Sequence, residues 1–276
     1  MSRTARDRPA PLRNLRLLLA YDGSVFHGWQ RQPGLRTVQA CIEEALARIT
    51  GEPAHLSGSG RTDASVHALG QVAHLTTSCP IPAGNLLKAL NDALPPEVRV
   101  LRAEDAPLGF HARYDSKSKL YRYRILQAAI CPPFIWRYVW HYPYPLDRRR
   151  MAQAAQAFLG KHDFTSFAAS AQADDDFGGP HAESERKSMV RSVVSSRVLW
   201  SERRRILVYE VEGSGFLHHM VRNIVGTLVE VGRGAMEAGG MERILNARDR
   251  TKAGPTAPAQ GLCLVRVEYQ DLRARI

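Results

Sequence analysis

Cysteine is scarce in this chain of 276 residues, which holds four, with no C-x-x-C pair among them. A structural zinc site needs clustered ligands, and a small disulfide-stabilised secreted domain needs a higher density of cysteine, so the sequence favours neither. We therefore expect reduced thiols, no bound metal and a cytoplasmic location. The four are Cys41, Cys79, Cys131 and Cys263.

Long apolar runs are also missing. No run approaches the roughly 20 residues that a membrane-spanning helix requires, so we expect no membrane partner. The first residues are basic, but no export-type apolar region follows them. We expect a disordered basic tail over residues 1–12.

Common nucleotide-binding and hydrolytic patterns are absent from the sequence as well. Gly58 and Gly60 suggest a phosphate loop, but neither the full dinucleotide fingerprint nor a G-K-[ST] ending is present, and no G-x-S-x-G occurs. His218 and His219 are neighbours, and neighbours on a helix point about 100° apart, which argues against a shared metal. The sequence predicts no cofactor.

Positive charge is what the chain has in excess: 38 Lys and Arg face 27 Asp and Glu, a formal net charge of +11. Such a balance favours a polyanionic partner, with nucleic acid ahead of an anionic membrane surface. The length is sufficient for one large or two modest domains, each with its own core.

Hydrophobic periodicity predicts strands and helices in the same order in both halves. The first half has strand patterns at 14–20, 55–57, 71–76 and 98–101, with helices from the N-cap Thr37 to the stop at Gly51 and from Pro82 to Pro95. The second half has strand patterns at 119–126, 190–199, 205–211 and 262–269, with helices through Met151 to the stop at Gly160, over 216–231 and around 241–245.

The order β-α-β-β-α-β in each half is typical of a ferredoxin-like unit. We predict an α/β (α+β) fold in which two such halves join a largely antiparallel sheet around a central basic cleft, the expected place for a long ligand. The expected subdomains are 13–112 and 113–276. Residues 168–188 hold little apolar surface and are predicted to form a mobile loop.

Asp63 lies in a loop after two glycines and before a strand pattern, which is a common way to present a reactive carboxylate. The same residue types also form ordinary turns, in which Asp only bonds nearby backbone. On its own residues the turn is the favoured interpretation.

Basic and aromatic residues alternate along 119–124, a pattern that suits phosphate contact and base stacking. Tyr121 and Tyr123 share one side of the predicted strand and Arg122 the other, with Lys119 just before. A solvated sheet face with packed tyrosines would look the same. Arg222 lies outside the apolar stripe of its predicted helix, so periodicity alone favours a solvated arginine.

Several of these motifs together resemble the signature of tRNA pseudouridine synthase I, the TruA family, in family order from about Leu15 to Tyr269. The matching motifs are Tyr21-Asp22-Gly23, Gly28-Trp29-Gln30-Arg31-Gln32, Gly60-Arg61-Thr62-Asp63-Ala64, Val66-His67, Phe110-His111-Ala112-Arg113, Tyr121-Arg122-Tyr123, Asp163-Phe164-Thr165-Ser166-Phe167, Phe216-Leu217-His218-His219-Met220-Val221-Arg222-Asn223 and Gly261-Leu262-Cys263-Leu264-Val265.

The resemblance implies roles by position. Asp63 corresponds to the catalytic aspartate, and Arg222 to its ion-pair partner, whose charge favours the carboxylate. Tyr121 corresponds to the tyrosine that stacks on the target uracil and is proposed to assist proton removal. Leu262 is expected to wall the pocket, and Arg61 to fill the space left by the displaced base. Substrate contacts are further expected from Arg113, Arg122 and Lys119.

The implied reaction is isomerisation of uridine to pseudouridine at tRNA positions 38–40, in the anticodon arm, on a flipped-out base, by a homodimer without cofactor. The carboxylate acts either covalently or by stabilising and deprotonating an intermediate. Two other readings stay open. One is a non-catalytic RNA-binding protein built on two ferredoxin-like halves, and the other a related synthase that acts on a different RNA.

Ser65 and Cys263 depart from the family pattern. Ser65 replaces a glycine, and a serine would be strained there if the backbone needed a positive φ; we expect that it does not. Cys263 stands where an aromatic residue is common. The 168–188 loop is longer than the family's usual connection.

Overall fold

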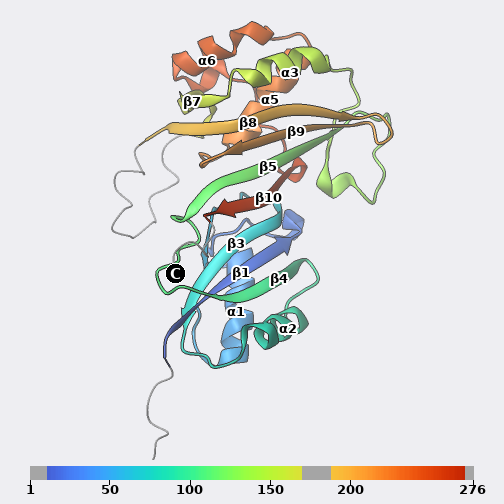
Figure 1. Cartoon of the computed structure of the whole chain (residues 1–276). Coiled ribbons are helices and arrows are strands. Elements are labelled where there is room, and N and C mark those ends of the chain that lie inside the picture. The colour runs from blue at the N-terminus through green and yellow to red at the C-terminus, as the bar shows by residue number, and fades with distance from the viewer. Residues whose placement is uncertain (1–10, 170–187, 271–276) are drawn as a thin grey trace, which may run out of the picture. The chain divides into compact units, whose positions relative to one another are not determined.

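The computed structural model describes residues 11–169 and 188–270 (Figure 1). The chain forms two compact units, one of Met1–Lys117 with Arg266–Ile276 and one of Ser118–Val265. Both mix helices with mostly antiparallel strands. The predicted tail and the predicted mobile loop fall mostly outside the described residues.

The first unit has the predicted order of elements. These are β1 (Arg13–Tyr21), α1 (Val38–Thr50), β2 (Ser57–Gly58), β3 (His67–Thr77), α2 (Ala83–Ala93) and β4 (Val98–Ala106). Strand β1 pairs antiparallel with both β3 and β4, and β2 extends the far side of β3. Figure 1 shows α1 and α2 packed beside these strands.

Helix α1 begins and ends where the sequence signals indicate. The Thr37 hydroxyl accepts the N–H of Ala40 at the N-terminus, and Gly51 adopts a left-handed φ of 75° at the C-terminus. Ile42 on α1 is fully buried, as are alternate residues of β1 such as Leu15 and Leu17. Their packing forms the core of this unit and holds the flanking loops in place.

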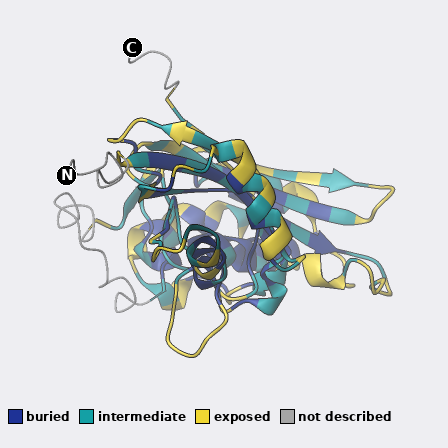
Figure 2. Cartoon of the chain, turned by 90° about the horizontal axis from the view of Figure 1, so that it is seen from below, coloured by how far each residue is buried: buried dark blue, intermediate teal, exposed yellow. Residues whose placement is uncertain are grey.

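The second unit is built on a sheet in the order β5-β9-β8-β7. Its neighbouring strands in that order are antiparallel, and along β9 buried residues mostly alternate with partly exposed ones; Figure 2 shows the chain coloured by burial. Its elements are β5 (Ser116–Leu126), β6 (Trp140–His141), α3 (Arg148–Gln156), β7 (Gly160–Asp163), β8 (Val190–Ser201), β9 (Ile206–Gly213), α5 (Met220–Gly232), α6 (Met241–Ala247) and β10 (Leu262–Tyr269), whose last residues belong to the first unit.

Two predicted boundaries in this unit were wrong. Helix α3 ends at Gln156, and Gly160 instead starts β7, a strand whose four polar or small residues give no hydrophobic alternation. Helix α5 starts at Met220 rather than Phe216, because His219 has a left-handed φ of 62° that a helix cannot include.

Within the described residues, no helix is long and apolar enough to cross a membrane.

Candidate active site

The Asp63 loop, residues 59–66 between β2 and β3, is held by backbone hydrogen bonds to the connection between β1 and α1. The Trp29 N–H donates to the Thr62 carbonyl at 3.0 Å, and the Ser65 N–H to the Phe26 carbonyl at 3.3 Å. These bonds fall on both sides of Asp63, so the backbone that carries the carboxylate is fixed before and after this residue.

Two glycines permit this close approach. A Cβ on Gly58 would lie 2.6 Å from the fully buried Trp29 ring, and one on Gly28 would lie 2.7 Å from the Thr62 carbonyl oxygen. Gly28 also has a φ of 88°. Gly58, one of the two glycines that suggested a phosphate loop in the sequence, therefore serves backbone packing here.

Side chains add further ties to the Asp63 loop. The Tyr21 hydroxyl lies 2.8 Å from the Thr62 hydroxyl, and the Arg61 Nε donates to the Gln30 amide oxygen at 3.1 Å. At the far end of the loop, the buried His67 ring accepts the Gly23 N–H on Nδ1 at 3.0 Å. The motifs that surround Tyr21, Trp29 and Asp63 in the sequence are therefore one structural unit.

Ser65 corrects an expectation, because its φ is 64°, in the left-handed region that favours glycine. The prediction that this position needs no positive φ is therefore wrong. Its N–H is engaged by Phe26, so the loop geometry imposes the conformation.

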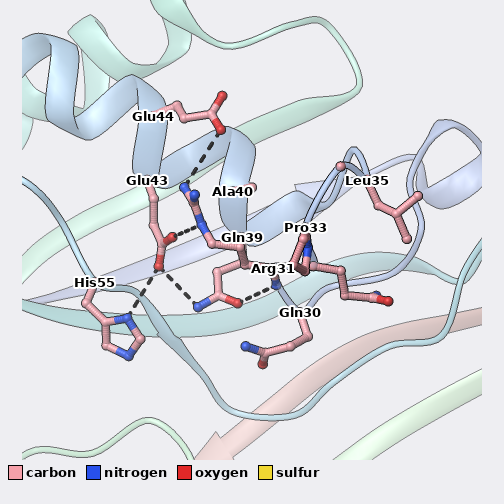
Figure 3. A pocket seen from close by; sticks show the side chains of 11 residues that line it. Gln30, Arg31, Pro33, Leu35, Gln39, Ala40, Glu43, Glu44 and His55 are labelled. Carbon is pink, nitrogen blue, oxygen red and sulfur yellow. Dashed lines mark hydrogen bonds and ion pairs between the residues drawn. The ribbon is translucent and has the colours of Figure 1, made fainter.

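A polar hollow of about 660 Å³ lies beside the Gln30 to Leu35 segment (Figure 3). At its wall the buried Glu43 carboxylate accepts from Arg31 Nε at 2.8 Å and from Gln39 Nε2 at 3.1 Å. Glu43 also accepts the Leu56 N–H at 2.9 Å, just ahead of β2. This carboxylate joins α1 to the strand that leads into the Asp63 loop.

In the second unit, Arg222 is half-buried on α5 and is fixed by the segment that follows α6. Its Nε donates to the Ala257 carbonyl at 2.8 Å, and its own carbonyl accepts the Ala257 N–H at 3.1 Å. The approach requires Gly226, whose Cβ would lie 1.6 Å from the Pro255 oxygen. Arg222 is therefore not the freely solvated arginine that periodicity favoured.

Tyr121 is 8% exposed and its ring meets Phe216 edge to face, with centroids 5.1 Å apart. Tyr123, two residues on, is fully buried and donates its hydroxyl to the Pro258 carbonyl at 2.6 Å. Burial raises the pKa of Tyr123. Leu262 starts β10 and is 5% exposed.

The expected RNA contacts differ in how they are engaged. Arg122 forms an ion pair with Glu210 of the neighbouring strand, with Nη2 and Oε1 2.7 Å apart. Lys119 pairs in register with Gly213 on the same strands and is half-buried. Arg113 lies in the connection between β4 and β5 and is half-buried.

Two histidine arrangements were not predicted. The His218 and His219 rings are in contact, with centroids 4.0 Å apart and an interplanar angle of 37°, since both residues precede α5 rather than lying on it. His74 on β3 lies 4.5 Å from the His111 ring and accepts the Ala112 N–H on Nδ1 at 3.2 Å. Burial and the nearby His111 lower the pKa of His74 to about 4.

The sequence profile of the tRNA pseudouridine synthase family matches residues 18–115 and 154–270. The tRNA pseudouridine synthase A of Solibacter usitatus is 51% identical over 94% of this chain and all of its own length. That of a Thermoanaerobacter species is 42% identical over the same shares, and that of Syntrophotalea carbinolica 44% identical over 92% and 96%. A solved chain of a Cbf5–Nop10–Gar1 complex, with 12% identity, 90% and 57% coverage and a TM-score of 0.34, is too distant to inform function.

These matches define the class of protein first: an enzyme, an isomerase that acts on tRNA. The chain belongs to the tRNA pseudouridine synthase family, as the motifs around Asp63 predicted. The matched residues include both the Asp63 loop and the Arg222 helix.

We expect Ser65→Gly to stabilise the protein by about 1 kcal/mol, because glycine adopts the left-handed conformation without the steric cost that serine bears. Chemical denaturation measures the difference. The matched control is Ser195→Gly in β8, where φ is negative and glycine is expected to destabilise. Equal effects of the two substitutions would contradict the strain at Ser65.

We expect the free energy of unfolding to fall as pH drops from about 6.5 to about 4, since His74 binds its proton in the unfolded chain well before it does in the folded one. Denaturation curves across this range measure the slope. His74→Asn offers an amide oxygen in place of Nδ1, and its slope is expected to be smaller. Because His111 also has a lowered pKa, part of the slope remains in the variant.

Proposed function

We propose that this chain isomerises uridine to pseudouridine at positions 38–40 of the tRNA anticodon arm, with the Asp63 carboxylate as the reacting group. The observation that carries this proposal is that two backbone hydrogen bonds, Trp29 N–H to Thr62 and Ser65 N–H to Phe26, fix the loop on both sides of Asp63. A carboxylate on rigid backbone meets the positional demand that such chemistry makes.

The reaction breaks the bond between N1 of uracil and C1′ of the ribose, turns the base, and joins C5 to C1′. The proton on C5 leaves and N1 gains one, so nothing is oxidised and no water is consumed. A target base in a stem is first flipped out of the stack. Asp63 acts either by attack on the substrate or by stabilising and deprotonating an intermediate.

Arg222 and Tyr121 complete the proposed machinery. We propose that the Arg222 guanidinium pairs with the Asp63 carboxylate, in keeping with the bonds to Ala257 that hold the arginine. Tyr121 stacks on the uracil and is suited to this role because its ring is positioned by Phe216. Leu262 walls the base pocket, and Arg61 occupies the space that the flipped base leaves.

Contacts with the tRNA backbone are proposed for Arg113, Lys119 and Arg122. Arg122 already pairs with Glu210, so a phosphate that binds this guanidinium competes with the ion pair. Their cations agree with the formal net charge of +11, which favours a polyanion.

We also propose that the protein is a cytoplasmic homodimer. Residues 127–146 contain no Asp, Glu or Lys, and among them Ile130, Phe134 and Trp136 are 80%, 91% and 53% exposed. Exposed aromatic surface of low charge is typical of protein interfaces. In a chain of such positive charge, this segment is where two copies can meet with little repulsion.

We expect Asp63→Asn to abolish pseudouridine formation in a tRNA transcript while leaving tRNA affinity within about twofold, because the amide cannot act as a nucleophile or base. Mass spectrometry of the product and a binding titration measure the two quantities. Asp92→Asn, an exposed position on α2, is the control. Undiminished product would instead favour a non-catalytic RNA-binding platform.

We expect Arg222→Lys to lower kcat roughly tenfold or more and to change tRNA affinity little, since lysine lacks the planar two-point grip on a carboxylate. Single-turnover kinetics separate the two effects. Arg243→Lys, at a surface pair with Glu237, controls for the loss of a guanidinium. A kcat equal to that of the unmodified protein would argue against the pairing with Asp63.

A further inference from the structure

Three rings form a column on the first unit. The His111 ring lies between the other two, with its centroid 4.5 Å from that of His74 and 4.2 Å from that of Tyr114. The interplanar angle of His111 is 33° to Tyr114 and 58° to His74, so the rings are tilted against one another and His111 is nearer to stacking on Tyr114 than on His74. Tyr114 is the exposed end of the column, with 40% of its surface open to solvent.

The column is anchored by alternate residues of the connection between β4 and β5. Phe110 and Ala112 point inward and are 3% and 0% exposed, in an apolar cluster with Val72. The buried Asn14 amide donates to the Phe110 carbonyl at 2.8 Å, and the Tyr269 hydroxyl to the Ala112 carbonyl at 2.6 Å. Because the residues on both sides are fixed, the backbone that carries His111 is rigid.

Hydrogen bonds also set the His111 ring itself. Its Nδ1 accepts the backbone N–H groups of Arg113 and Tyr114, at 3.2 and 3.3 Å. The Asp115 carboxylate accepts the His111 N–H at 2.8 Å, and the Asp115 N–H returns to the His111 carbonyl at 3.1 Å. The turn thus presents Tyr114 without the freedom of an ordinary exposed loop residue, which lowers the entropic cost of stacking on it.

The charges around the column suit a nucleic acid. Arg113 and Lys117 lie within three residues of Tyr114 in the sequence and in the same unit, against the single carboxylate Asp115, which accepts the His111 backbone N–H. Burial lowers the pKa of both His74 and His111, which favours the neutral form of these two rings. An aromatic face among cations is the arrangement on which unpaired bases stack.

We propose that Tyr114, supported by His111, is a stacking platform for an unpaired base of the tRNA, apart from the base that reacts at Asp63. The proposal rests on the proposed function, which supplies an RNA substrate. The platform contributes affinity and register rather than chemistry, since none of its three rings is part of the proposed catalytic set. A protein partner is the competing occupant, but a surface with this excess of positive charge favours RNA.

The test compares Tyr114→Leu with Tyr114→Phe in a titration of unmodified tRNA transcript, at two salt concentrations. We expect the leucine variant to raise Kd about 5-fold or more, the range that loss of one stacked base implies. The phenylalanine variant is expected to stay within about twofold, because it keeps the aromatic face. Both are expected to keep the slope of log K against log salt, because neither removes a cation.

Three controls keep the result interpretable. Leu108→Ala changes an exposed apolar residue of the same connection, 65% exposed, and is expected to leave Kd unchanged. An RNA duplex without unpaired nucleotides is expected to bind the leucine variant and the wild type equally. Thermal melts of each variant report whether the fold is intact, and the phenylalanine variant retains the local packing if the leucine variant is destabilised.

Equal tRNA affinity of Tyr114→Leu and the wild type would overturn the platform, as would an equal loss with the duplex. A change in sedimentation mass in place of a change in Kd would assign the surface to a protein partner and also overturn it. None of these readouts requires turnover, so they test the platform even if Asp63→Asn proves active. Activity of Asp63→Asn would refute the proposed function and leave the test of the platform unchanged.

Discussion

Backbone hydrogen bonds between two loops are the constraint on which the rest of the first unit's site depends. The connection after β1 binds the loop after β2 through Trp29 and Phe26. This contact is possible because Gly58 has no side chain where the Trp29 ring lies. Around this contact, Tyr21, His67 and Arg61 each add a bond at a different point of the Asp63 loop, and the core beneath α1 supports them.

The second unit fixes its own candidate residues by the same principle. Segment 253–258 wraps α5 so closely that Gly226 has no room for a Cβ, and its Ala257 holds Arg222 through two bonds. Gly261 is likewise at a close contact, since a Cβ there would lie 2.5 Å from the Tyr123 ring. In both units, glycines at close contacts allow a backbone segment to position a functional side chain.

The sequence predicted the regular elements well where a physical signal was local. Thr37 and Gly51 bound α1 because a cap hydroxyl and a left-handed glycine act on adjacent backbone. Strand β7 was missed because it is defined by pairing with β8, which lies far away in the sequence. Helix α5 was predicted to start too early because a histidine in the sequence does not indicate the left-handed backbone that His219 adopts.

The candidate site was predictable only through resemblance. By its own residues, the Asp63 loop reads as a turn, and the bonds that make it rigid come from residues more than 30 positions away in the sequence. Ser65 shows the limit of position-by-position comparison: a serine in place of glycine suggested a relaxed backbone, yet the loop's ties impose the positive φ. The ring column at His111 was not predictable from the sequence because His74 comes from β3, while His111 lies in the connection between β4 and β5.

Amide hydrogen exchange is the most direct test of this central constraint. If the hydrogen bonds between the two loops fix the Asp63 backbone, the N–H groups of Trp29 and Ser65 are expected to exchange slowly. Their rates should match those of buried core amides of the first unit, for example Leu17 on β1. Exchange of these two amides much faster than that of the core, in the intact protein without tRNA, would contradict the account.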